Sequence, residues 1–115
     1  MNTLHARESE RSAAEVELTL TATSTLTRKQ IAEYKAIVLN AATATTTTLP
    51  AASTDMAGVY RMIGNVGAGV ASVYVAAGFG GVGATATTID LAQGEMTLVY
   101  CSGTYWFALH HTAAS

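Results

Sequence analysis

The residues of this chain that could do chemistry are few, and the first to consider are two carboxylates. Asp90 and Glu95 lie five positions apart, with a Gln-Gly turn signal between them. Paired carboxylates can act as general acid and base, as in glycoside hydrolysis. No arginine lies near them in the sequence. We therefore expect Asp90 to accept backbone N–H groups in a turn, and Glu95 to lie on an exposed strand face.

His110 and His111 are the candidate metal ligands. Successive residues of a strand point to opposite faces, so this pair cannot chelate one ion. Three copies of one histidine could meet around an ion on a three-fold axis, but an exposed polar strand end is the simpler interpretation. Cys101 is the only cysteine, which excludes a disulfide framework and a cysteine-based zinc site. We expect Cys101 to be a small buried residue.

The glycine-rich segment 78–83 is the candidate phosphate loop. It lacks the Lys-Ser or Lys-Thr ending of a P-loop, and no helix signal follows it. Glycines also occupy bends where two backbones approach closely, and we expect such a bend here. For the whole chain we therefore predict no enzymatic activity, no catalytic residue, no metal and no cofactor.

The charge of the chain is low and unevenly placed. Only 12% of the residues are charged, against about 25% in an ordinary soluble domain. Ten of the fourteen formal charges lie in residues 1–35, and the net charge is −2 without a basic block. Nucleic-acid binding needs a cationic stripe, which is missing. A small monomer needs surface charge to stay unassociated, so the body of the chain favours a homo-oligomer.

The first 14 residues are expected to form a flexible arm. They are charged and small, with neither a period of 2 nor a period of 3.6. Fully extended, the arm would reach on the order of 45 Å. It does not have the pattern of a signal peptide, and no later stretch is apolar enough for a membrane-spanning helix. Residues 15–115 are expected to form one β-domain.

The elements that must position these residues are mostly short strands. Val16, Leu18 and Leu20 alternate with polar residues, which predicts a strand. Thr27 and Gln30 have the spacing of a capping box, so either a short helix through Tyr34 or a polar loop follows. Further strands are predicted at 35–40, 58–63, 70–76, 85–91, 95–101 and 104–110.

The Thr-rich tract 41–54 could be a linker or a strand. Four consecutive threonines favour extended chain. Pro50 cannot donate a backbone hydrogen bond and belongs at a strand end or at a sheet edge. We therefore predict an edge strand.

Aromatic residues gather in the last predicted hairpin. Alternation places Met96, Leu98 and Tyr100 on one face, and Tyr105, Phe107 and Leu109 form the corresponding set on the partner strand. Trp106 points the other way, and both a core role and an interface role are open for it. Because Trp and Tyr often carry binding energy, the candidate interface residues are Trp106, Tyr105 and Tyr60.

Short strands at regular spacing, with turn signals between them, predict an all-β fold. The expected architecture is a small antiparallel β-sandwich or jelly-roll-like domain with an extended N-terminal arm.

The order of several motifs resembles a module found in virion proteins of tailed bacteriophages. The motifs cover roughly residues 37–110. They are Leu49-Pro50-Ala51-Ala52, Ala57-Gly58-Val59-Tyr60, Ile63 with Asn65, Val73 with Val75, Gly78, Ile89 with Leu91, Gly94-Glu95 with Leu98, and Gly103 with Trp106. The tract 21–35 is not part of the pattern. Such modules occur in capsid-decoration (cement) proteins and in fibre domains.

The resemblance implies a homotrimer without catalytic residues, assembled in the host cytoplasm and located on the capsid surface of the virion. It implies that the protein stabilises the head, with its arm contacting the major capsid protein. The arm residues that would make these contacts are Leu4, Arg7, Glu8, Glu10 and Arg11. The alternative that the resemblance leaves open is a tail- or head-fibre domain that binds a host receptor or glycan.

Overall fold

The computed structural model describes residues 16–81 and 86–111. The candidate capsid contacts Leu4, Arg7, Glu8, Glu10 and Arg11 lie outside the described residues, as does the whole of the predicted arm, residues 1–14.

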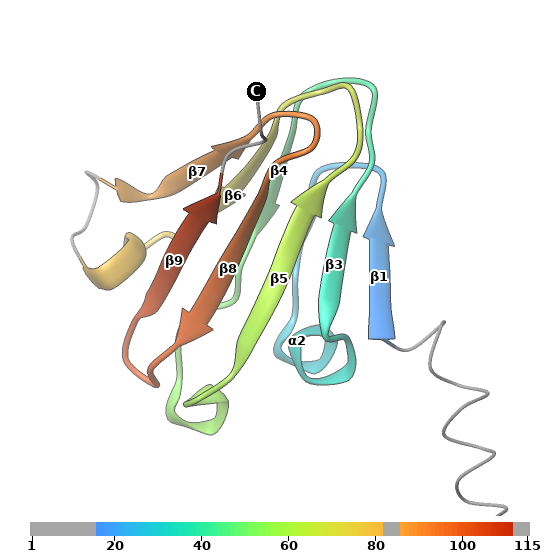
Figure 1. The fold of residues 1–115 in the computed structure, drawn as a ribbon. Coiled ribbons are helices and arrows are strands. Elements are labelled where there is room, and N and C mark those ends of the chain that lie inside the picture. Colours follow the sequence, from blue (N-terminus) through green and yellow to red (C-terminus); the bar gives the residue numbers. More distant parts are fainter. Residues whose placement is uncertain (1–15, 82–85, 112–115) are drawn as a thin grey trace, which may run out of the picture.

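The described residues form two β-sheets and one short α-helix (Figure 1). The five-stranded sheet has the order β1 (Glu17–Leu20), β3 (Ala36–Leu39), β5 (Tyr60–Asn65), β8 (Met96–Cys101), β9 (Trp106–His111). The four-stranded sheet has the order β2 (Ser24–Thr25), β4 (Thr45–Thr48), β6 (Ala71–Tyr74), β7 (Thr88–Leu91). Helix α2 spans Arg28–Glu33, and two 3₁₀ turns span Thr54–Met56 (η1) and Phe79–Gly81 (η2). The protein is thus a small β-rich domain.

Both sheets are mixed, so the prediction of an antiparallel architecture is wrong for the first six strands. The chain passes alternately from one sheet to the other between β1 and β6, and each strand therefore lies parallel to the strand two before it. Only the later pairs β5–β8, β8–β9 and β6–β7 are antiparallel. The Thr-rich tract does form a strand, β4, but it lies between β2 and β6 rather than at an edge. Pro50 lies beyond the end of β4 and interrupts no ladder.

One hydrophobic core joins the two sheets. Ile37, Ile63 and Val99 contribute to it from the five-stranded sheet, and Val73 and Leu91 contribute from the four-stranded sheet. Each is almost completely buried, and burying one such side chain stabilises a fold by about 1.5–3 kcal/mol. The core therefore consists of every second residue of each strand, as the alternation requires.

Helix α2 connects β2 to β3 and begins with the predicted capping box. Thr27 Oγ1 accepts a hydrogen bond from the Gln30 amide at 3.1 Å, and Gln30 Oε1 accepts one from the Thr27 amide at 3.0 Å. The helix has only six residues, and Ile31 is its buried residue. A helix this short is unstable without its cap and its packing.

We expect Thr27→Ala to lower the free energy of unfolding by about 1 kcal/mol, because the Gln30 backbone amide loses the hydroxyl that accepts its hydrogen bond. Thr27→Ser keeps the hydroxyl and should stay close to the wild type. Urea denaturation of both variants measures the difference. Equal stabilities for the alanine and serine variants would show that the cap contributes nothing.

The turns 40–44 and 66–70 stack on each other where the chain crosses between the sheets. The amide of Gly69 donates to the carbonyl of Ala41 at 2.9 Å. A Cβ atom on Gly69 would lie 2.1 Å from the carbonyl oxygen of Thr43, and one on Gly67 would lie 2.3 Å from the amide nitrogen of Ala41. Glycine is therefore required at both positions by the close approach of two backbones.

Asn65 holds the 66–70 turn from inside. Its side-chain amide donates to the carbonyls of Gly69 at 2.9 Å and Leu91 at 2.8 Å, and its Oδ1 accepts from the Gly67 amide at 3.0 Å. The residue is 2% exposed. A buried polar side chain is tolerated only when its groups are hydrogen-bonded, and these three bonds meet that condition.

Candidate functional site

The outward surface of the five-stranded sheet is apolar over three of its strands, β5, β8 and β9. Alternation sends Ile63, Val99 and Trp106 into the core and turns their neighbours outward. We call the outward set the outer face. It consists of Tyr60, Met62, Met96, Leu98, Tyr100, Phe107 and Leu109, on strands β5, β8 and β9.

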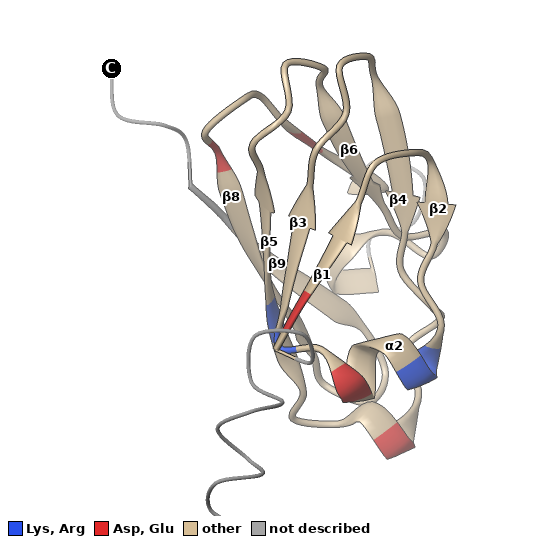
Figure 2. Ribbon diagram, turned by 90° about the vertical axis from the view of Figure 1, so that its right-hand side faces the viewer, with Lys and Arg blue, Asp and Glu red and all other residues tan. Residues whose placement is uncertain are grey.

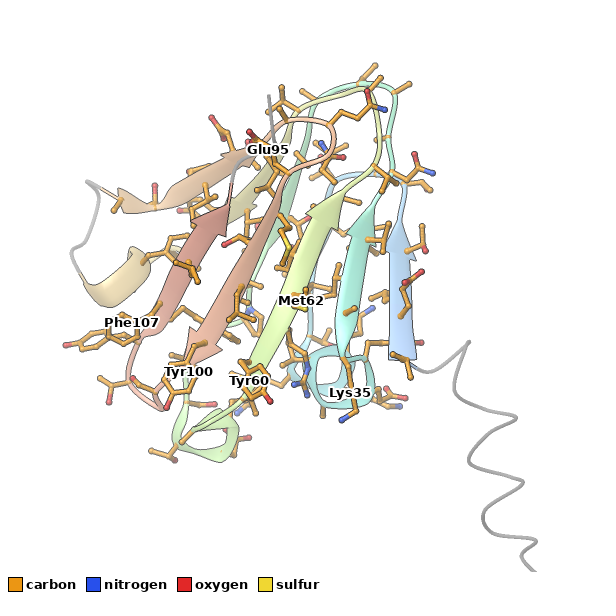
Figure 3. All side chains as sticks on the ribbon, in the orientation of Figure 1. Lys35, Tyr60, Met62, Glu95, Tyr100 and Phe107 are labelled. Atoms are coloured by element: carbon orange, nitrogen blue, oxygen red, sulfur yellow. The ribbon has the colours of Figure 1, made fainter. Side chains whose placement is uncertain are left out.

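The residues of the outer face form continuous rows across the three strands. Tyr60 pairs with Tyr100, which pairs with Phe107. Met62 pairs with Leu98, which pairs with Leu109. Tyr60 is 61% exposed, Met62 48% and Leu109 69%. Figure 3 shows Tyr60, Met62 and Tyr100 on the same side of the sheet, with Phe107 near the β9 edge.

The outward surface of the four-stranded sheet has the opposite character. Its strands turn the polar residues Thr46, Thr48, Ser72, Thr88 and Asp90 away from the core, together with the aromatic Tyr74. Ser72 Oγ donates to Asp90 Oδ1 at 2.7 Å across the β6–β7 pair. A sheet with one face in water is expected to alternate apolar-in with polar-out. The four-stranded sheet follows this rule, and the outer face of the five-stranded sheet violates it.

Most charged side chains of the described residues lie at the end of the molecule that carries α2 (Figure 2). Arg28 forms an exposed ion pair with Asp55 at 3.3 Å. A hydrogen bond from Ser53, and then the charge of Arg28, lower the pKa of Asp55. Arg61 donates from Nε to the Ile31 carbonyl at 2.8 Å, and partial burial lowers its pKa. The charges thus gather at one end and leave the outer face uncharged.

A groove of about 410 Å³ lies where the outer face meets this charged end. Its walls are Lys35, Gly58, Val59, Tyr60, Arg61 and Met62. None of these lining residues is an acid, a histidine or a cysteine. The groove therefore offers apolar contact and positive charge to a ligand.

The structure gives the two candidate carboxylates separate roles. Asp90 lies in β7 and accepts from Ser72 Oγ, so the prediction that it accepts backbone N–H groups in a turn is wrong. Glu95 has that role, because its Oε1 accepts from the Ala92 backbone amide at 2.9 Å in the turn before β8, so the prediction that Glu95 lies on an exposed strand face is also wrong. Asp90 lies in the four-stranded sheet, while Glu95 lies in a turn outside both sheets.

Cys101 and Trp106 both belong to the core. Cys101 is completely buried, as predicted. Trp106 is 1% exposed, and its Nε1 donates to the Pro50 carbonyl at 2.7 Å. Its assignment as a candidate interface residue is therefore corrected to a core role. Tyr60 and Tyr105, at 61% and 43% exposed, remain at the surface.

The glycine-rich segment begins with the 3₁₀ turn η2, and its residues 82 and 83 lie outside the described residues. Gly80 and Gly81 have φ values of 68° and 74°. A Cβ atom on Gly81 would lie 2.4 Å from the ring of Tyr105. The described part is thus a bend after β6, as predicted, but its close contact is with the side chain of Tyr105, just before β9, and not with another backbone.

Two further observations concern metals and membranes. The backbone of His110 pairs with β8, as predicted, and so does that of His111, one residue beyond the predicted strand, while their side chains lie outside the described residues. Among the described side chains, those of residues 16–81 and 86–109, no three from His, Cys, Asp or Glu come together as a metal site would require. In the same ranges no helix has the length and apolar character needed to span a membrane.

Comparisons of the chain with models of known families, with curated proteins and with solved structures find no match. The function of the chain is therefore inferred from its outer face. Sequence reasoning placed Met96, Leu98 and Tyr100 on one side of a strand, but the pattern could not show that this side is exposed, because Thr97, Val99 and Cys101 on the other side are also largely apolar.

Proposed function

We propose that this protein is a structural component of a bacteriophage virion, a capsid-decoration protein that binds the outer surface of the head as a homotrimer and stabilises it. In this proposal the two sheets form a β-sandwich or jelly-roll-like body. One observation supports it above the others. The outer face presents large apolar side chains to water, while the outward face of the other sheet is polar.

Such a surface favours a role in assembly. Monomeric soluble proteins rarely expose contiguous apolar patches larger than a few hundred Å², and larger patches mark binding surfaces. In a decoration protein such a patch would be covered permanently, because the subunits work only in contact with each other and with the shell.

The proposed mechanism is mechanical. The trimer lies on the shell, and residues 1–14 of each subunit contact coat subunits, so that added contact area resists expansion of the head. Ordering a flexible segment costs about 1–2 kcal/mol per residue for the backbone. The contacts that each arm makes with the shell must offset this cost, and after the first arm binds, the other two bind at a high effective concentration.

We expect deletion of residues 1–14 to leave a folded body and to weaken binding to heads by about 100-fold or more, since three arms are lost together. Co-sedimentation with isolated heads and, separately, isolated tails of the phage whose genome encodes the chain measures this. A full-length chain with residues 1–14 in scrambled order keeps the length and charge of the arm and should bind as weakly as the deletion.

Binding of the truncated chain to heads at wild-type strength would contradict the proposed role of the arm. Binding to tails and not to heads would replace decoration by the alternative, a fibre domain for a host receptor or glycan. Screening the purified protein against a glycan array would then identify the ligand class.

A further inference from the structure

We infer that the outer face is the surface by which copies of this chain bind each other. The inference rests on the proposed function for its homo-oligomer, and it assigns the subunit contact to β5, β8 and β9. The contact with the shell is thereby left to other parts of the molecule.

The area of the outer face fits a subunit interface. A large aromatic side chain covers about 150–250 Å². Five side chains of the outer face are between 42% and 69% exposed, so together they present roughly 500 Å². A standard interface covers about 800 Å² on each partner. The outer face would thus supply most of one interface, and neighbouring small residues such as Ala36 and Val38 would extend it.

The chemistry of the outer face favours a second copy over an unrelated partner. None of its seven residues is charged, and the only hydrogen-bonding side chains among them are those of Tyr60 and Tyr100. Permanent homomeric interfaces are more apolar than interfaces between partners that also exist apart. A shell protein that must be recognised after separate folding would instead be selected by complementary charge.

The position of charges also sets the limits of the contact. Glu17 of β1 pairs with Ala36, which pairs with Met62, so the first charge in this row lies two strands away from Met62. Lys35 lies at the end of β3 and lines the groove described above. The contact is therefore centred on Met62 and Leu98. It does not include β1, from which the chain leads back to the predicted arm.

The decisive variants place a carboxylate on the outer face. Met62 is 48% exposed and Leu109 69%, so Met62→Glu and Leu109→Glu leave the new charge in water in a single subunit. In an assembly the same charge would be buried without a partner, which is strongly unfavourable. Tyr74→Glu is the matched control, because Tyr74 lies on β6 of the other sheet and points away from the core.

Multi-angle light scattering of the purified full chain tests the inference. The wild type and Tyr74→Glu should have the mass of an oligomer, at least twice the 11.9 kDa of one chain. Met62→Glu and Leu109→Glu should be monomers at the same concentration, with association weakened about 100-fold or more, and their circular dichroism should match the wild type.

Two results would overturn the inference: a monomeric wild type, or an oligomer that both glutamate variants leave intact. The experiment needs no phage particle, so its outcome is separate from head binding. A chain that self-associates through the outer face but never binds heads would remove the proposed function and leave this inference standing.

Discussion

Replacing Asn65 with aspartate is expected to lower the free energy of unfolding by about 3–5 kcal/mol at pH 7. The Asn65 amide donates to the carbonyls of Gly69 and Leu91, and a carboxylate can donate to neither. The residue is 2% exposed, so the new charge would be buried against two carbonyl oxygens. Although aspartate and asparagine have nearly the same shape, the substitution therefore changes a satisfied site into a repulsive one.

The loss should depend on pH in a defined direction. Burial and the two carbonyls disfavour the charged carboxyl, so its pKa in the folded variant lies above that in the unfolded chain. The folded state then binds more protons than the unfolded state, and stability falls as pH rises between the two pKa values. The difference from the wild type should therefore be smaller at pH 4 than at pH 7.

Urea denaturation of Asn65→Asp, Asn40→Asp and the wild type at both pH values measures this effect. Asn40 is exposed, and its substitution should cost little at either pH. The described role of Asn65 would be wrong if its substitution cost no more than that of Asn40.

Gly69→Ala should also be strongly destabilising, by about 3–4 kcal/mol. The added methyl group would lie 2.1 Å from the Thr43 carbonyl oxygen, which is backbone and cannot rotate away as a side chain can. The turns 40–44 and 66–70 would have to separate, and the hydrogen bond from Gly69 to Ala41 would be lost.

Gly64→Ala is the matched control for this substitution. A Cβ atom at Gly64 would meet nothing closer than 4.0 Å. The free energy of unfolding of this variant should therefore lie within about 1 kcal/mol of the wild-type value. Thermal and urea denaturation compare the two. Similar stabilities for the two alanine variants would show that the turns are not packed as described.

Local elements could be predicted because their signals are local. Alternation predicted β1 and β8, and the Thr27–Gln30 spacing identified the start of α2, whereas β5 begins and ends two residues later than the predicted strand 58–63. The pairing of strands could not be predicted in the same way. Thr45–Thr48 lies between β2 and β6 because the chain crosses repeatedly between the two sheets. The residues of a strand carry no signal that shows which sheet the chain crosses to before or after it.

The candidate site was predicted only in part for a related reason. Both sides of β8 are rich in apolar residues, and only the position of the second sheet determines that Val99 is buried and Tyr100 is 42% exposed. Trp106 shows the same dependence, because the Pro50 carbonyl that accepts its hydrogen bond lies 56 positions away in the sequence. Burial depends here on contacts that only the complete fold provides.

The central claim is that protein covers the outer face in the working state, and methionine oxidation measures this coverage residue by residue. Oxidation by hydrogen peroxide depends on exposure. Met62 lies in the middle of the outer face, while Met56 is 5% exposed and serves as the internal reference. If copies cover the outer face, peroxide should oxidise Met62 in the intact protein nearly as slowly as Met56. Oxidation of Met62 at the rate found in the urea-unfolded chain would contradict the account.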